Sequence, residues 1–334
     1  DQLTSYERPY PMLVLTGGDC FERPDLVDLI EYAVGKGLHV SISPSVTPLF
    51  TRERVKAVQD AGVSVMSMSL DGGSAETHDA FRGFPGTFDR TIEACHMLNE
   101  LGMRFQLNTV FTAKNIHEAP QMLKNAIDLG AFMFYTFMLV PTGRGQHLDM
   151  LTPHEREDVL HWLHDNSTRI AIKTTEAPQY RRIAFQREAV RQGKAAPAKH
   201  GELYHWLTKE THELLGENIE EPRPPRTPLA INSGSGFAFI DHTGDVYPSG
   251  FLPIHCGSIK DTPFPQIYRE SEVFRALRNP SGFEGKCGAC EFNHFCGGSR
   301  STAYAMTGNY LASDPSCAHI PAGYTGELPE GIER

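Results

Sequence analysis

The sequence predicts an α/β fold, in which a partial (β/α)6 TIM-like barrel is joined to a small cysteine-rich domain. From Pro11 to about Thr175, short apolar runs alternate with longer segments whose apolar residues recur every three or four positions. This alternation is typical of βα units and a mainly parallel sheet. Glycine lies between a helical segment and the next strand at Gly37, Gly62, Gly102 and Gly130, as expected where helices end in a left-handed cap.

Six strands and five helices are expected in this first half of the chain. The strands are predicted at residues 12–16, 38–43, 64–69, 104–111, 132–140 and 169–174, and the helices at 25–34, 52–61, 88–101, 116–129 and 153–164. A barrel carries its chemistry on the loops that follow the carboxyl ends of its strands, so candidate site residues are sought there. The aromatic run of Phe132, Phe134, Tyr135 and Phe137 is interpreted as a strand packed on both faces, and therefore as core.

The second half of the chain has a different composition. Residues 179–218 are helical and charged in character, and a proline run at 220–228 breaks any helix. A hairpin is expected from residues 236–240 and 246–248, on either side of the turn His242-Thr243-Gly244-Asp245. The chain is therefore divided into a barrel (1–178), a helical linker with the proline-rich boundary (179–228) and a cysteine-rich domain (229–334).

The composition is that of a globular protein, with 334 residues and a net charge of −10 from 31 Lys and Arg against 41 Asp and Glu. This acidic balance disfavours a nucleic-acid partner. No apolar run reaches the eighteen residues that could span a bilayer, and residues 1–15 lack the pattern of a secretory signal. A cytoplasmic protein with neither a membrane nor a nucleic-acid partner is expected.

Five of the seven cysteines fall in the last quarter of the chain. Cys287 and Cys290 are separated by two residues, Cys296 follows after five more, and Cys317 after another twenty. Such clustering is typical of a metal site in a reducing compartment. Four thiolates can hold one [4Fe-4S] cluster or a tetrahedral zinc ion, and their spacing does not separate the two. Four ordinary buried cysteines are the remaining alternative, and Cys256 is interpreted as a packed thiol.

The cysteine pattern carries a specific resemblance. The pattern Cys287-x2-Cys290-x5-Cys296-Gly-Gly-Ser-Arg, followed by Asp314-Pro-x-Cys317, resembles the auxiliary-cluster region of radical S-adenosylmethionine (SAM) enzymes with SPASM or twitch extensions. It is similar to the branch around heme d1 and alternative heme biosynthesis. The resemblance implies an auxiliary [4Fe-4S] cluster on Cys287, Cys290, Cys296 and Cys317. Ser249 and Ser299 stand where fuller or related patterns have cysteine, so one auxiliary cluster is expected, not two.

The barrel half resembles the same family at its strand ends. Gly17, Gly18 and Asp19 follow the first visible strand and match the Gly-Gly-Glu-like motif that binds the SAM amino group in that family. Ser69 and Asn108 are the other candidate cofactor-binding residues, although the Ser69 hydroxyl alternatively caps the next helix.

Two further features complete the barrel half. Arg144 is a candidate partner for a substrate carboxylate or phosphate, or else a solvated loop charge. His78-x2-Phe81-Arg82-Gly83 is similar to the helical linker of many SPASM-containing members.

The resemblance also implies a Cys-x3-Cys-x2-Cys loop that binds the radical [4Fe-4S] cluster, and the seven cysteines contain no such trio. The sequence begins a few residues before the strand expected to be second in the barrel. We therefore expect an N-terminally truncated enzyme rather than a degenerate one, inactive as this chain alone, with a second (radical) cluster only if upstream residues exist. Cys20 does not replace the trio, because one thiolate cannot do the work of three.

The function implied by the resemblance is that of a radical SAM oxidoreductase, which uses a 5′-deoxyadenosyl radical for side-chain modification of a tetrapyrrole. A reducing partner such as flavodoxin or ferredoxin is implied with it. One alternative is a SPASM maturase that acts on a ribosomally made peptide. Another is a non-catalytic iron–sulfur or zinc-binding protein.

Overall fold

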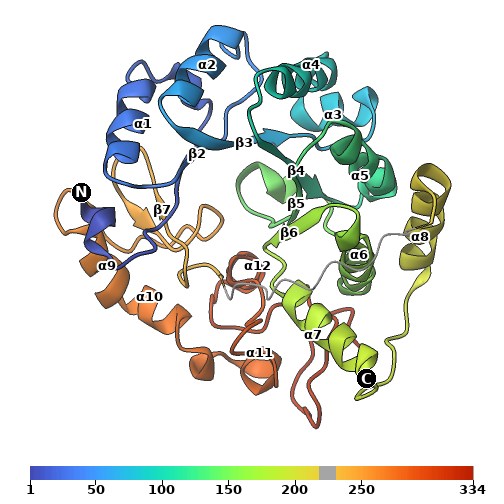
Figure 1. Cartoon of the computed structure of the whole chain (residues 1–334). Coiled ribbons are helices and arrows are strands. Elements are labelled where there is room, and N and C mark those ends of the chain that lie inside the picture. Colours follow the sequence, from blue (N-terminus) through green and yellow to red (C-terminus); the bar gives the residue numbers. More distant parts are fainter. Residues whose placement is uncertain (218–230, 334) are drawn as a thin grey trace.

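Six parallel strands form one sheet and follow one another in sequence order (Figure 1). This computed structural model describes residues 1–217 and 231–333, except the side chains of Arg144 and His147. The strands are β1 (Leu13–Leu15), β2 (Val40–Ile42), β3 (Val63–Ser69), β4 (Phe105–Phe111), β5 (Met133–Met138) and β6 (Ala171–Thr175). Each lies within one residue of its predicted range, so the predicted α/β partial barrel is confirmed.

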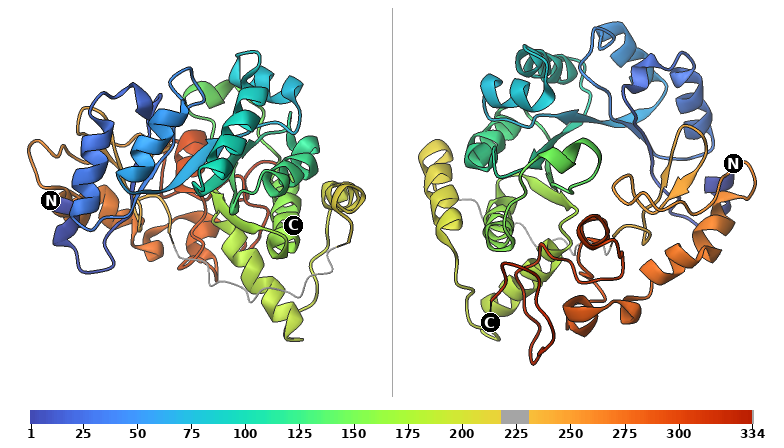
Figure 2. Two further views of the ribbon diagram at one scale, coloured as in Figure 1. Left: turned by 45° about the horizontal axis from the view of Figure 1, so that its top comes forward. Right: turned by 180° about the vertical axis from the view of Figure 1, so that it is seen from behind.

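Helices cover the outer face of this sheet in both views (Figures 1 and 2). They are α1 (Leu26–Gly35), α2 (Arg52–Asp60), α3 (Ala75–Arg82), α4 (Thr87–Glu100), α5 (Ala119–Asp128) and α6 (Pro153–Asp165). Side-chain caps fix where three of them begin: Thr51, Ser74 and Thr152 each accept a hydrogen bond from a backbone N–H three residues on. Gly62 shows why glycine precedes a strand, because its φ is +106° and a Cβ there would lie 2.9 Å from Val34 Cγ1.

The two faces of the sheet differ in burial. In β5, Phe134, Thr136 and Met138 are buried, whereas the alternating residues Tyr135 and Phe137 are only half-buried. Phe134 belongs to the main core, which the sheet forms with the outer helices. The interpretation of the whole aromatic run as core is therefore wrong for Tyr135 and Phe137, which lie on the opposite, inner face of the sheet.

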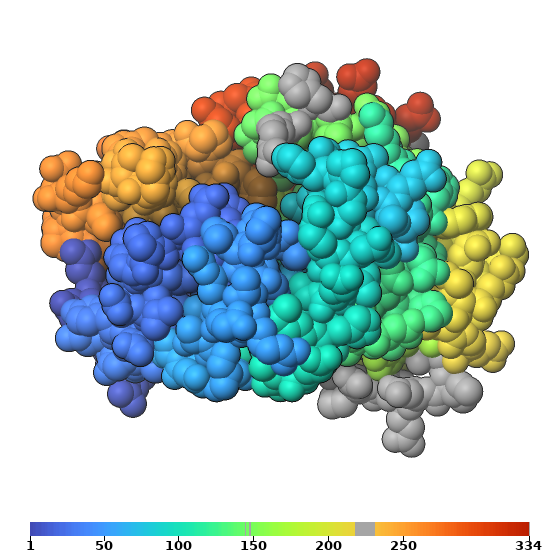
Figure 3. Space-filling view, turned by 90° about the horizontal axis from the view of Figure 1, so that it is seen from above, coloured from blue at the N-terminus to red at the C-terminus, as the bar shows by residue number. Residues whose placement is uncertain are grey.

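The C-terminal part continues from β6 around to the N-terminus (Figures 1 and 3). Its elements are α7 (Gln179–Arg191), α8 (Glu202–Leu215), the antiparallel pair β7 (Phe239–Ile240) and β8 (Val246–Tyr247), α9 (Phe264–Glu270), α10 (Glu272–Leu277), α11 (Gly285–Ala289) and α12 (Arg300–Thr307). Short 3-10 helices are η1 (Gln2–Ser5), η2 (Cys20–Glu22), η3 (Ile116–Glu118), η4 (Gly143–His147), η5 (Asn166–Thr168) and η6 (Pro280–Gly282). The structure contains the predicted hairpin, whereas the proline run 220–228 lies outside the described residues.

Contacts between α9 and η1 join the N-terminal segment to the C-terminal part. The backbone N–H of Phe264 donates to Gln2 Oε1 at 2.7 Å, and Leu3 and Tyr6 pack against a small second core that contains Val246 and Phe264. The C-terminal part therefore bridges both edges of the six-stranded sheet. No helix among the described residues is long and apolar enough to cross a membrane.

A pair of phenylalanine variants tests which ring lies in the core and which lies on the surface. Phe134 is fully buried, whereas Phe84 is 68% exposed. Phe134→Ala is expected to lower the free energy of unfolding by about 3–5 kcal/mol, because it removes a core ring and leaves a cavity. Phe84→Ala should change it by about 0.5 kcal/mol or less in the same urea titration. Equal losses for the two variants would contradict the described core.

Candidate functional site

Four cysteines from the C-terminal part line one pocket. Cys287 lies in α11, Cys290 caps its carboxyl end, Cys296 lies in the following turn, and Cys317 follows α12. The structure thus brings the four predicted metal ligands together, although twenty residues separate the last two. The pocket lining also includes Arg182, Lys286, Asn293, Gly297, Gly298, His319 and Pro321. Cys256 lies apart from this lining and donates its thiol hydrogen to the carbonyl of Ile254 at 3.4 Å.

Hydrogen-bond donors point at two of the four sulfurs. The backbone N–H of Asp314 lies 3.3 Å from Cys287 Sγ, and the Arg300 guanidinium donates to the same sulfur at 3.5 Å. The backbone N–H of Phe292 donates to Cys290 Sγ at 3.5 Å. Such donors stabilise a sulfur that carries negative charge, as in a metal-bound thiolate.

Two buried cations next to the cysteines lack a carboxylate partner. Lys286 is 2% exposed and donates to the carbonyl of Cys317, and Arg300 is fully buried and donates to the carbonyls of Tyr310 and Ala312. Neither forms an ion pair within residues 1–217 and 231–333. Burying an uncompensated cation is costly. Four thiolates around a metal supply the missing negative charge, so the residues present fit a bound metal cluster.

Burial also sets the protonation of the thiols. It raises the pKa of Cys296 to about 12 and that of Cys290 to about 11. As free thiols, Cys290 and Cys296 are therefore neutral at physiological pH, and metal binding must displace their protons. Both iron–sulfur clusters and zinc bind thiolates in this way, so the geometry does not choose between the two metals.

Gly298 is the residue that lets the chain pass close to this pocket. Its φ is +67°, and a Cβ there would lie 2.6 Å from Arg300 Nη2 and 3.0 Å from Cys287 Sγ. A side chain at this position would push a ligand sulfur and a buried cation apart.

A second cluster joins this region to the end of β6. The carboxylate of Glu176 is buried and accepts hydrogen bonds from the hydroxyls of Ser299 (2.5 Å), Ser301 (2.9 Å) and Ser249 (3.5 Å). Burial raises the pKa of Glu176, which the serine hydrogen bonds oppose. Ser249 and Ser299, noted in the sequence as replacements for cysteine, therefore share one carboxylate.

Glu176 has a left-handed φ of +56°, which is uncommon for a non-glycine residue. Sequence reasoning missed Glu176, because its partners lie 73 to 125 residues away; its place directly after β6 was the one available signal.

The carboxylate of Asp314 also links the cysteine-rich region to the helix after β6. It accepts from the side-chain amide of Gln179 at 2.6 Å and from the backbone N–H of Ser299 at 2.7 Å. Because the Asp314 N–H also donates to Cys287, a continuous set of hydrogen bonds connects α7 with a ligand sulfur.

The predicted cofactor residues lie at the carboxyl edge of the sheet. Gly17 and Gly18 are exposed after β1, and Asp19 is 8% exposed. The Asp19 carboxylate accepts from the Thr47 hydroxyl at 2.7 Å and from the Phe21 N–H at 3.1 Å, so it ties the loop after β1 to the loop after β2. The Ser45 N–H also donates to this carboxylate, at 3.3 Å. Because an ionised carboxylate has about four acceptor positions, about one remains for a ligand.

Ser69 and Asn108 are direct neighbours across β3 and β4, and both are half-buried. The helix after β3 is capped by Ser74, so the alternative role of Ser69 as its cap is wrong. The backbone of Arg144 lies in η4, but its side chain lies outside the described residues, and its predicted role stays a prediction.

The loop after β3 is held by buried polar groups. The Asp71 carboxylate pairs with Arg82 and accepts from the backbone N–H of Val110 at 2.8 Å, and the Asp71 N–H donates to His78 Nδ1 at 3.0 Å. Burial lowers the pKa of His78, which favours the neutral ring that this hydrogen bond requires. The His78 and Arg82 motif therefore positions the loop that directly follows Ser69.

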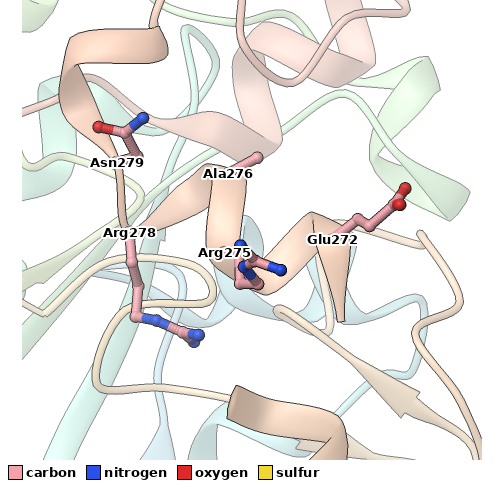
Figure 4. Close-up of a pocket in the computed structure, with 5 residues that line it drawn as sticks. All are labelled: Glu272, Arg275, Ala276, Arg278 and Asn279. Atoms are coloured by element: carbon pink, nitrogen blue, oxygen red, sulfur yellow. The ribbon is translucent and has the colours of Figure 1, made fainter. Parts of the chain in front are cut away.

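Two other groups of side chains lie close together on the molecule. A hollow beside α10 is lined by Glu272, Arg275, Ala276, Arg278 and Asn279, whose side chains point in different directions (Figure 4). Arg278 donates to the carbonyls of Tyr268 and Arg269, so its charge is used within the fold. Cys290, Glu291 and His319 offer ligand atoms within 4.8 Å of one another, but this group shares Cys290 and His319 with the four-cysteine pocket.

Comparison with known proteins gives consistent results. The sequence model of the radical SAM superfamily matches residues 1–126. The chain is 39% identical to the AdoMet-dependent heme synthases of Oleidesulfovibrio alaskensis and Methanosarcina barkeri, over 93% of its length and 75% and 83% of theirs. It is 28% identical to the Fe-coproporphyrin III synthase of Methanosarcina barkeri, over 95% of its length and 77% of the relative.

The fold is similar to that of Streptococcus suis SuiB bound to S-adenosylmethionine. The TM-score is 0.61 at 12% identity, over 92% of this chain and 66% of SuiB. SuiB bound to its precursor peptide SuiA gives a TM-score of 0.59 at 12% identity, over 90% and 63%. The chain thus spans slightly less than two thirds of SuiB, and at these identities the likeness concerns the fold alone.

A pair of glycine variants tests the fit of the four-cysteine pocket. Gly298 and Gly308 have similar positive φ values of +67° and +75°, but nothing lies within 4 Å of a Cβ at Gly308. After anaerobic reconstitution, Gly298→Ala is expected to bind less than half the metal of the parent protein, because its methyl group crowds Cys287 and Arg300. Gly308→Ala carries the same backbone strain and should keep the full amount. Equal metal content in both variants would show that Gly298 does not shape the site.

Proposed function

This chain belongs to the radical SAM superfamily, in the branch of the AdoMet-dependent heme synthases, and we propose from that membership that it modifies side chains of a tetrapyrrole. The observation that carries the proposal is 39% identity over nearly the whole chain to relatives with that name. Relatives whose names state a peptide substrate are more distant, at 26% identity for the PqqA peptide cyclase of Rhodopseudomonas palustris and 12% for SuiB bound to its precursor peptide. A tetrapyrrole is therefore favoured over a ribosomally made peptide.

We propose that Cys287, Cys290, Cys296 and Cys317 hold one auxiliary [4Fe-4S] cluster. The convergence of the four sulfurs, the donors aimed at Cys287 and the unpaired cations Lys286 and Arg300 support this assignment. Ser249 and Ser299 hold the Glu176 carboxylate, which supports the expectation of a single auxiliary cluster. The domain division at 179–228 is part of the same proposal.

SAM is proposed to bind at the carboxyl edge of the sheet. The free acceptor position of Asp19 would take the SAM amino group, and the exposed backbone at Gly17 and Gly18 would allow close approach. The amide and hydroxyl of Asn108 and Ser69 would bind polar atoms farther along the cofactor. SAM supplies radical hydrogen abstraction in this superfamily when a second, reduced cluster binds it. A small electron donor such as flavodoxin or ferredoxin would provide the electrons.

The seven cysteines include no Cys-x3-Cys-x2-Cys trio, so the binding of a cluster, of SAM and of a tetrapyrrole are the properties to test on this chain. The side chains in this proposal would bind and orient the cluster, the cofactor and the substrate. Glu176 and Asp314 fix the four-cysteine pocket against the sheet, and Asp71 fixes the loop of Ser69.

Metal and sulfide content test the cluster assignment. Anaerobically reconstituted protein is expected to contain about four irons and four acid-labile sulfides per chain, with the paramagnetic resonance signal of a reduced cubane cluster. Cys296→Ser should lose most of both, because it removes one ligand, whereas Cys256→Ser should keep them. Stoichiometric zinc without sulfide would contradict the iron–sulfur assignment and leave a structural zinc site.

Tetrapyrrole binding tests the substrate class. Iron coproporphyrin III, titrated into the reconstituted protein, is expected to shift its Soret absorption with a stoichiometry of about one per chain, because the site takes one planar ligand. S-adenosylmethionine binding is measured on the same sample by calorimetry. A protein that binds S-adenosylmethionine but leaves the Soret band unchanged would contradict the tetrapyrrole and favour another substrate.

A further inference from the structure

Side chains on the inner face of the sheet form rows across the strands. The register places Ser69 opposite Asn108, Asn108 opposite Tyr135, and Tyr135 opposite Lys173. Because paired residues in a parallel sheet point to the same face, all four project inward, away from the outer helices. Ser69, Asn108 and Tyr135 are half-buried and Lys173 is exposed, so this row is accessible to a ligand.

Aromatic rings gather at the β5 end of this row. The ring centroids of Tyr135 and Phe137 lie 4.7 Å apart at an interplanar angle of 38°, and Phe251 approaches Phe137 edge-on at 6.4 Å. Phe251 comes from the C-terminal part, between Ser249 and the turn that follows, and is 37% exposed. These three rings, here called the inner aromatic surface, therefore combine the sheet with the cysteine-rich part.

A cation adjoins the inner aromatic surface. Lys173 Nζ lies 4.7 Å above the centroid of the Tyr135 ring. In the part of the chain that the structure describes, no carboxylate forms an ion pair with Lys173. An accessible ammonium group without an anionic partner is available for a carboxylate or phosphate on a ligand.

Hydrogen bonds at the end of β6 hold the inner aromatic surface in place. The Tyr135 and Thr175 hydroxyls are hydrogen-bonded, and Thr175 directly precedes Glu176, whose carboxylate is bound by Ser249, Ser299 and Ser301. Two of these serines lie close in sequence to the surface and to the pocket: Ser249 lies two residues before Phe251, and Ser299 lies three residues after Cys296. The Glu176 cluster therefore fixes the aromatic rings relative to the four-cysteine pocket.

We propose that Tyr135, Phe137 and Lys173 bind the substrate, and that this substrate is a flat conjugated macrocycle bearing carboxylate side chains. The aromatic rings would stack against the macrocycle, and Lys173 would pair with one of its carboxylates. The inference rests on the proposed function, to which it adds the residues that recognise the ring and the acid group. It also places the substrate between the row of Ser69 and Asn108 and the cysteine-rich part.

Binding titrations with two probes separate the contribution of aromatic stacking from that of the Lys173 ion pair. Iron coproporphyrin III carries four carboxylates, and its tetramethyl ester carries none. Lys173→Gln is expected to weaken binding of the acid about tenfold and to leave binding of the ester unchanged. Tyr135→Leu and Phe137→Leu should weaken both probes by roughly three- to tenfold, because both probes stack. Tyr135→Phe keeps the ring but loses the hydrogen bond to Thr175, so it should weaken binding of both probes less than Tyr135→Leu does.

Matched controls come from elsewhere on the surface. Lys199→Gln removes an exposed lysine of the loop after α7, and Phe84→Leu removes an exposed ring before α4; neither should change binding. Iron content and circular dichroism of each variant report whether it is folded and loaded. If the parent protein binds coproporphyrin and the Lys173, Tyr135 and Phe137 variants bind it equally well, the inner aromatic surface is not the binding site, while the proposed function stands. If the parent protein binds neither probe, both are overturned.

Discussion

The charge balance around four clustered thiols, two of them buried and two half-buried, is the constraint on which the C-terminal part depends. Among the residues that the structure describes, no carboxylate pairs with the buried Lys286 and Arg300, and their donors point to backbone carbonyls and to Cys287 Sγ. A cation in such surroundings is tolerated when negative charge lies nearby. Thiols whose pKa is raised by burial supply that charge only when a metal replaces their protons. In the proposed cluster, a bound metal would therefore complete the fold of this region as well as its chemistry.

Hydrogen bonds connect the four-cysteine pocket to the barrel. Asp314 joins Cys287 to Gln179 of α7, and Glu176 joins three serines of the C-terminal part to the end of β6. The same strand end holds Thr175, which fixes Tyr135 on the inner face. Hydrogen bonds therefore join the cysteine pocket, the sheet edge and the inner aromatic surface, which suits the proposed site because a binding site needs supported side chains.

Much of this arrangement was predictable from local sequence. The strands, the glycines after the helices and the four cysteines were found because each has a short-range pattern. The burial of Tyr135 and Phe137 was predicted wrongly, because an uninterrupted aromatic run hides the alternation that separates the two faces of a strand. Glu176 was missed because its partners are distant in sequence, and the unpaired state of Arg300 depends on which groups surround it. Such features follow from tertiary packing.

Anomalous diffraction from crystals of the anaerobically reconstituted protein tests the central claim most directly. Data collected at the iron edge are predicted to show one compact anomalous peak bonded to Cys287, Cys290, Cys296 and Cys317, with Lys286 and Arg300 beside it. A peak at the zinc edge in its place, or four cysteines without a bound metal in folded protein, would contradict the account.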